Sequence, residues 1–200
     1  KARKPPVAAP ARPAAPTANA AAPPVPAPDE RPAAPAILPE GHRRWSVGET
    51  EKRLLQTRER DDVARALLDF AAGVAPRAVL FVVRRDEVAA WLWSGDGIEG
   101  EKLSTLRLNL KQPSLFAGLR EAGAYFRGPL SPLPSHLALA ACFGAPAITG
   151  DLLVLPVKVK ERLVAALLVE PRPASGSDLT SGDLADLQRV IAKAEIAFEL

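Results

Sequence analysis

The sequence has no methionine, a single cysteine (Cys142) and only two histidines (His42 and His136) among its 200 residues. One cysteine excludes an internal disulfide framework and a zinc site built from several cysteines. The two histidines are far apart in the sequence and lack the spacing of a metal-ligand pair. We therefore predict no metal site and no bound cofactor. Because position 1 is not methionine, we also expect the chain to be part of a longer protein or a processed product.

Long hydrophobic runs are absent as well. Runs such as Leu137 to Phe143 and Leu152 to Val157 contain seven and six residues, whereas a membrane helix needs about 20. Four prolines interrupt the apolar stretch 18–28 and exclude the helical core of a signal peptide. We predict no membrane span. The single cysteine is compatible with a reducing compartment, and we expect a cytoplasmic location.

Over most of the chain, basic and acidic side chains are nearly equal in number. The formal net charge is +3, but residues 1–46 alone carry seven basic and three acidic side chains, which leaves the remainder close to neutral. A neutral domain lacks the positive surface of a nucleic-acid-binding protein, so we predict no nucleic-acid partner.

The N-terminal region has a composition of its own. Residues 1–40 hold 12 of the 21 prolines together with 14 alanines, and few large apolar side chains. Such a segment cannot bury enough apolar surface to offset the entropy of ordering it. We predict a disordered, basic, Pro/Ala-rich linker over residues 1–46 and one folded domain over residues 47–200. Since spacers join domains, we expect another domain before Lys1.

Hydrophobic periodicity predicts a mixture of helices and strands in the second region. Residues 49–75 have helical spacing, and a capping box at Thr180 and Asp183 predicts a helix from there to the end of the chain. Shorter helices are expected at 114–121 and 135–143. Strands are expected at 78–83, 88–93, 105–110, 124–127, 152–158 and 163–169. The paired runs at 78–93 and 152–169 each predict a hairpin, and their nearly continuous hydrophobicity indicates that helices cover both faces of the sheet.

Three segments resemble a GAF domain, and the resemblance covers about residues 50–200. LRLNLKQPSLFAGLREAGAYFRGPL (106–130) is similar to the family's third strand, small helix and following short strand. DLLVLPVKVKERLVAALLVE (151–170) is similar to its most recognisable hairpin, and SDLTSGDLADLQRVIAKAEIAFEL (177–200) to its closing helix. The sequence departs from the family at Leu179, where an aromatic residue is usual, and at Ala165, where glycine is usual.

The resemblance implies an α+β fold with a central six-stranded antiparallel sheet flanked by helices. The related PAS and roadblock-like folds are the alternatives. It also implies a bacterial signalling protein, in which such domains regulate other domains and often form dimers through their terminal helices.

One motif suggests a nucleotide site. Residues 95–100 match the pattern GxGxxG, which binds pyrophosphate when a helix opens directly after it and an acidic residue follows about twenty positions on. We predict a strand instead of a helix after this motif, and residues 114–117 contain no acidic side chain. The motif is therefore interpreted as a glycine-rich loop.

No catalytic group can be assembled from the remaining residues. There is no Ser/His/Asp, paired-carboxylate or Cys/His arrangement, so we predict that the domain is not an enzyme. Sulfoxide reductases that share the GAF fold rely on several cysteines, and this chain has one. Cys142 lies in small, apolar sequence and is interpreted as a buried, inert thiol instead of a chromophore attachment site.

Two sets of residues remain as candidate sites. A small-molecule pocket between the sheet and the small helices would be lined by Trp91, Trp93, Leu108, Phe116, Tyr125, Phe126, His136 and Phe143. We favour the interpretation that these are core residues. The last helix carries a heptad-like stripe that could contact a protein partner or a second copy, made of Leu184, Leu187, Ile191, Ala194 and Phe198. The sequence thus predicts a non-enzymatic regulatory module that acts by protein contact, with a small-molecule sensor as the alternative.

Overall fold

The computed structural model describes residues 45–144, 147–148, 150–171 and 179–199, and all of its helices and strands belong to one unit, residues 32–200. The helices are α1 (Val47–Gln56), α2 (Arg60–Val74), α3 (Gly100–Thr105), α4 (Leu115–Ala122), α5 (Pro134–Ala140) and α6 (Ser181–Glu199). The strands are β1 (Arg77–Arg84), β2 (Glu87–Ser94), β3 (Arg107–Asn109), β4 (Phe126–Gly128), β5 (Leu152–Val159) and β6 (Arg162–Glu170).

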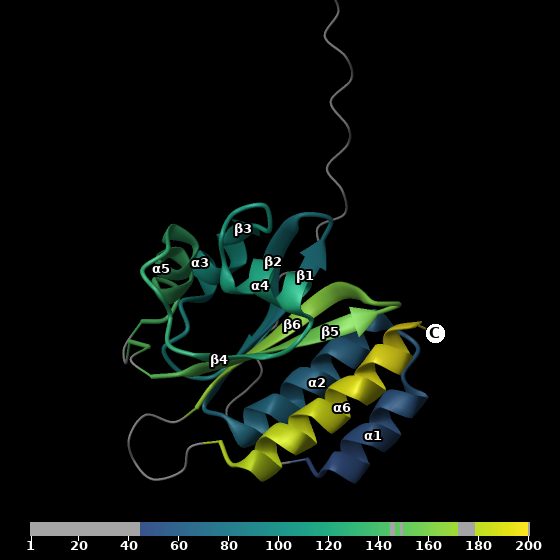
Figure 1. Cartoon of the computed structure of the whole chain (residues 1–200). Coiled ribbons are helices and arrows are strands. Elements are labelled where there is room, and N and C mark those ends of the chain that lie inside the picture. The colour runs from purple at the N-terminus through teal and green to yellow at the C-terminus, as the bar shows by residue number, and fades with distance from the viewer. Residues whose placement is uncertain (1–44, 145–146, 149, 172–178, 200) are drawn as a thin grey trace, which may run out of the picture. The chain divides into compact units, whose positions relative to one another are not determined.

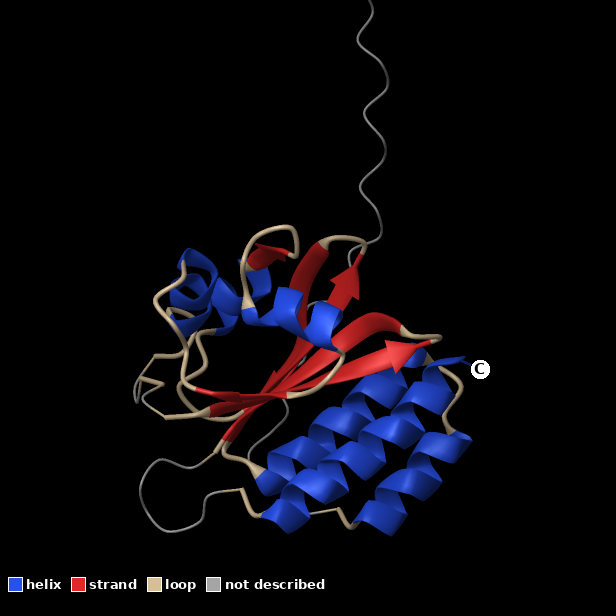
Figure 2. Ribbon diagram, viewed as in Figure 1, coloured by secondary structure: helices blue, strands red, loops and turns tan. Residues whose placement is uncertain are grey.

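The six strands form one antiparallel sheet in the order β3-β2-β1-β6-β5-β4 (Figure 2). Two local hairpins, β1–β2 and β5–β6, lie side by side in its centre, and the pairing of β1 with β6 joins them. Both predicted hairpins are confirmed. Their turns use left-handed backbone at Arg85 and at Lys160 and Glu161, the conformation that two-residue hairpin turns require.

Helices cover both faces of the sheet, as Figure 1 shows. Helices α1, α2 and α6 lie on one side, and α3, α4 and α5 lie on the other. Side chains from the central strands alternate between two separate hydrophobic cores, one beneath each helical layer. The predicted α+β fold with a six-stranded antiparallel sheet flanked by helices is therefore confirmed.

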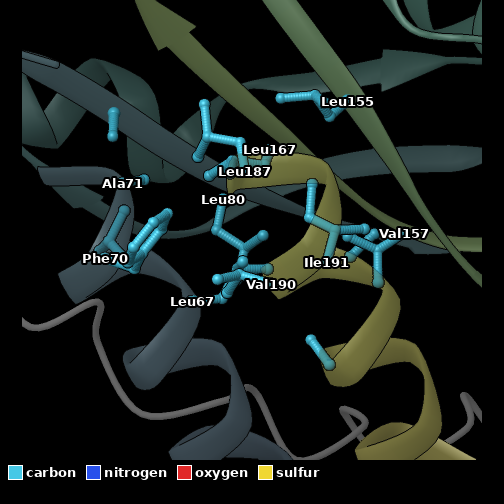
Figure 3. Close-up of a cluster of buried hydrophobic side chains, with 14 of the residues drawn as sticks. Leu67, Phe70, Ala71, Leu80, Leu155, Val157, Leu167, Leu187, Val190 and Ile191 are labelled. Carbon is cyan, nitrogen blue, oxygen red and sulfur yellow. The ribbon is translucent and has the colours of Figure 1, made fainter. Parts of the chain in front are cut away.

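The core beneath α2 and α6 holds the long helices onto the sheet. In Figure 3, Leu67 and Phe70 of α2 and Val190 and Ile191 of α6 meet strand residues such as Leu167. These side chains are almost completely removed from water. Burying a leucine or phenylalanine side chain contributes about 1.5–3 kcal/mol, so this layer is a principal source of the domain's stability.

The single helix predicted over residues 49–75 is wrong, because the chain forms two helices with a break at residues 57–59. Thr57 leaves the helix with extended backbone, and its hydroxyl donates to the carbonyl of Arg53 at 2.6 Å. At its other end α1 is fixed by a capping box between Ser46 and Glu49. The break allows α1 to fold back, and Arg53 pairs with Asp69 of α2 at 2.6 Å.

Two residues at the N-terminal end of the folded domain, Trp45 and Ser46, have structural roles that were not predicted from the sequence. The predicted linker over residues 1–46 lies outside the described residues except for its last two. Ser46 caps α1, and Trp45 packs against the core beneath α2 and α6. Among the described residues, no helix is long and apolar enough to cross a membrane.

The prediction that no helix follows the GxGxxG motif is wrong. Helix α3 begins at Gly100, and the strand expected over 105–110 is confined to Arg107–Asn109. The glycines nevertheless have structural roles. Gly95 has a φ of +117°, and a Cβ there would lie 2.2 Å from the carbonyl oxygen of Pro76. The motif is a tight turn between β2 and a six-residue helix.

Replacing Gly95 and Gly118 by alanine should change the free energy of unfolding in opposite directions. Gly95→Ala should lower the free energy of unfolding by about 2 kcal/mol or more, because the new methyl group collides with backbone in a left-handed conformation. Gly118→Ala, the matched control on α4, meets no atom within 4 Å and should raise stability by about 0.5–1 kcal/mol. Urea unfolding followed by circular dichroism measures both. Equal effects at the two positions would contradict the assigned turn.

Candidate functional site

Most of the predicted pocket residues lie in the layer between the sheet and the small helices. Trp93, Leu108, Phe116 and Phe143 are buried there, and Phe126 packs against them from the sheet edge. They come from β2, β3, α4, β4 and the segment that follows α5. The structure therefore brings together residues that are spread over more than 50 positions of the chain.

The side chains of this layer pack against one another. The rings of Phe81 and Phe116 meet edge to face with centroids 4.9 Å apart, the geometry that aromatic pairs prefer in cores. Leu103 of α3 and Leu139 of α5 are completely buried against them. The arrangement agrees with the interpretation of these residues as core.

His136 is a buried residue that joins two segments of this layer. Its Nε2 accepts a hydrogen bond of 2.9 Å from the backbone N–H of Leu115, at the start of α4. Because Nε2 accepts, the neutral ring carries its proton on Nδ1, which lies 2.9 Å from Ser131 Oγ and 3.2 Å from the Ser131 carbonyl oxygen. Both ring nitrogens are thus engaged in positioning α4 and α5.

Two of the predicted pocket residues lie elsewhere. Strand β2 has a β-bulge opposite Leu80 and Phe81, where Trp91 is the extra residue without a partner in β1. The bulge shifts the alternation of the strand, so Trp91 faces the core beneath α2 and α6 whereas Trp93 faces the opposite core. Tyr125 is 43 % exposed. Trp91 therefore lies apart from the other candidates, and Tyr125 is not part of their hydrophobic cluster.

The stripe predicted as an interface on α6 faces the domain's own core. Leu187 and Ile191 point into the core beneath α2 and α6 (Figure 3). Ala194 and Phe198 are buried in the same cluster, and Leu184 packs against it. Helical periodicity marked the apolar face of α6 correctly, but α2 and the sheet occupy it. The four buried side chains cannot contact a partner without opening the fold, and Leu184 is partly buried.

The buried thiol of Cys142 matches its interpretation as an inert cysteine. Its Sγ lies 3.4 Å from the carbonyl oxygen of Ala138, and burial raises the pKa of this thiol above its ordinary value. A raised pKa keeps the sulfur protonated at neutral pH, and a protonated thiol is a poor nucleophile. Among the described residues, no three His, Cys, Asp or Glu side chains are placed to hold a metal ion.

A buried ion pair was not predicted. Arg77, the first residue of β1, and Glu170, the last residue of β6, form a salt bridge in which Nη2 donates to Oε1 at 2.6 Å. The Arg77 guanidinium also lies 5.3 Å from the ring centroid of Phe143. No local pattern signals this pair, because its members are 93 positions apart.

A cavity of about 300 Å³ opens at the other end of the sheet, on the side of α2 and α6. Its walls include Trp91, Phe198 and Val164, with Arg60 and Arg84 at the rim. This cavity was also missed from the sequence. Its residues come from six elements, and the β-bulge that turns Trp91 toward it has no recognisable sequence signal.

The comparisons with known proteins rest on structure alone. No protein-family model matches the chain, and no curated protein matches its sequence. Several solved structures do match it. A GAF domain/HD domain protein from Geobacter sulfurreducens is similar over 74 % of this chain and 96 % of its own, with a TM-score of 0.57 and 13 % identity. The second GAF domain of DevS from Mycobacterium smegmatis is similar over 70 % and 94 %, with a TM-score of 0.52 and 14 % identity.

The structure of an enzyme is similar to this chain to about the same degree as the GAF domains. The free methionine-R-sulfoxide reductase from Neisseria meningitidis, solved in complex with its substrate, matches 76 % of this chain and 86 % of its own, with a TM-score of 0.55 and 17 % identity. The described domain therefore has the GAF fold.

Alkylation of the single cysteine should be slow in the folded protein. At pH 8, iodoacetamide should modify Cys142 at least about tenfold more slowly than in urea, because burial both covers the sulfur and keeps it protonated. Stability that depends on this thiol should fall as the pH rises through its ordinary pKa, because only the unfolded state then ionises. Mass spectrometry of timed samples measures the rate. Equal rates in the two states would contradict the burial of this group.

Proposed function

We propose that this domain is a non-enzymatic regulatory module of a signalling protein and that it acts by contact with another copy of itself. The observation that carries the proposal is the packing of buried side chains between the sheet and α3, α4 and α5. There the rings of Phe81 and Phe116 are in contact and His136 has both nitrogens engaged. The GAF fold, shared with DevS and the GAF domain/HD domain protein, supports a regulatory role.

The outer surface of α1 and α6 supports a protein contact. Helix α1 is held on the helical layer by the ion pair of Arg53 with Asp69 and by that of Glu51 with Arg189, at 2.8 Å. Beyond these contacts Leu55 of α1 is 70 % exposed, and Ile196 of α6 is 52 % exposed.

The charges on this surface favour contact with a second copy of the same chain. Exposed side chains of both signs accompany the apolar ones, with Lys52 on α1 and Asp186 and Glu199 on α6. Two copies related by a twofold axis present the same patch to each other, so a patch of mixed sign can match itself. The proposed contact therefore uses α1 and the exposed face of α6, and leaves the buried stripe in place.

The likeness to the methionine sulfoxide reductase supports no reductase activity here. Reduction of a sulfoxide by cysteine leaves a disulfide, which requires a second thiol from the protein or from another molecule. This chain has Cys142 alone, and that thiol is buried and protonated.

Self-association should depend on the two exposed apolar residues. The Leu55→Glu/Ile196→Glu variant should weaken the dimer at least about tenfold, because each substitution places a charge in the contact. Leu137→Glu is the matched control, since Leu137 is 59 % exposed on α5, across the sheet from the proposed contact. Light scattering over a concentration series measures the mass. A chain that is monomeric at every concentration, or a control that weakens the dimer equally, would contradict the proposal.

The domain should not turn over free methionine-R-sulfoxide. With dithiothreitol as reductant, the rate should equal that of the Cys142→Ser variant and of dithiothreitol in buffer, because the protein's one thiol is buried. Methionine formation followed by chromatography measures it. A rate that exceeds buffer and is lost in Cys142→Ser would show that the domain is an enzyme.

A further inference from the structure

The cavity on the side of α2 and α6 combines apolar and charged side chains in its lining. It lies where both central hairpins turn, between the first turn of α2 and the last turn of α6. At about 300 Å³ it falls at the lower end of the range of small-molecule sites. Neither Leu55 nor Ile196, the residues of the proposed dimer contact, lines it.

The inner wall of the cavity is apolar. The bulged Trp91 points to this side of the sheet, and its ring lies 6.2 Å from that of Phe198, tilted by 35°. Val159 and Val164 complete the wall from the end of the β5–β6 hairpin. These side chains present an apolar surface that a hydrocarbon or aromatic group would cover.

The rim of the cavity has a surplus of positive charge. Arg60 and Arg84 line it, and neither has an ion-pair partner among the described residues. Lys111 and Arg120, at the same end of the sheet, are by contrast both paired with Asp86. Asp61 is the one acidic residue in the lining, so two cations face one carboxylate.

The N-terminus of helix α2 lies at this rim, with Asp61 and Asp62 in its first turn. The helix begins at Arg60, and its N-cap residue Glu59 makes no side-chain hydrogen bond to the first turn. The N-terminus of a helix carries partial positive charge from its backbone N–H groups, which favours an anion. Among the described residues, two guanidinium groups without an ion-pair partner therefore flank an apolar cavity, with the Asp61 carboxylate and the first turn of α2 beside them.

We infer that this cavity binds a small organic anion with an apolar body, such as a medium-chain carboxylate. The hydrocarbon chain would lie against Trp91, Phe198 and Val164, and the carboxylate would lie between Arg60 and Arg84. A neutral molecule of the same shape would leave both guanidinium groups unpaired, and a cation would be repelled by them. The ligand would contact α2 and α6 at once, which connects occupancy of the site to both long helices.

Three probes of the same chain length test this inference on the whole protein. Decanoate, decanol and decyltrimethylammonium are titrated below their aggregation limits by isothermal calorimetry. Decanoate should bind at least about tenfold more tightly than either of the others, because it alone can pair with the arginines. It should also raise the thermal midpoint of unfolding, because it binds the folded state. Equal binding of decanoate and decanol, or no binding of decanoate, would overturn the inference.

Variants then place the binding in this cavity. Arg60→Gln/Arg84→Gln should weaken decanoate at least about tenfold and leave decanol unchanged. Arg58→Gln is the matched control, because Arg58 is exposed and near in sequence but does not line the cavity. Val164→Phe should fill the cavity and abolish binding, while the unliganded thermal midpoint shows that the variant is folded. Unchanged decanoate affinity in both the double variant and the folded Val164→Phe would overturn the assignment of the site.

Discussion

The pairing of β1 with β6 is the constraint on which the rest of the domain depends. Each of these strands already belongs to a local hairpin, and their register from Arg77 opposite Glu170 to Val82 opposite Ala165 joins the hairpins into one sheet. Both strands are then central, so their side chains on both faces must be covered. The two helical layers meet that requirement. The buried salt bridge between Arg77 and Glu170 closes one end of the pairing, where an unpartnered buried charge would cost several kcal/mol.

The sheet divides the domain into two layers with different properties. On the side of α3, α4 and α5, short helices bring large side chains such as Phe116 into close contact, and the buried polar groups of His136 are satisfied internally. On the other side, α2 starts and α6 ends near the hairpin turns, so the helices stop covering the strands there. The cavity at Trp91 and Phe198 follows from where these two helices end.

Much of this architecture could be predicted because its signals are local. Two apolar runs around a short polar turn specify a hairpin wherever they occur, and the capping box of Thr180 with Asp183 is formed as expected. The break between α1 and α2 was missed because it contains neither glycine nor proline. It depends on the hydroxyl of Thr57 and on the contact of Arg53 with Asp69 in the folded structure.

The candidate sites were less predictable from the sequence, because they depend on which helix or strand packs against which other one. The periodicity of α6 identifies its apolar side, but an apolar stripe looks the same whether a sheet or a second protein covers it. Trp91 and Trp93 are two positions apart, so a regular strand would place them on one face, and a single bulge reverses that relation. The pairing of Arg77 with Glu170 and the cavity lining both combine residues that only the completed fold brings together.

The bulge in β2 has a practical consequence for spectroscopy. Trp91 and Trp93 are two positions apart in the chain, yet one belongs to the core beneath α2 and α6 and the other to the core beneath α3, α4 and α5. Strand β2 therefore carries one indole fluorophore on each of its two faces. With Trp45 and one of the two replaced by phenylalanine, the emission of the remaining indole would follow the loosening of a single layer, and the two proteins together would reveal whether the layers come apart at the same time.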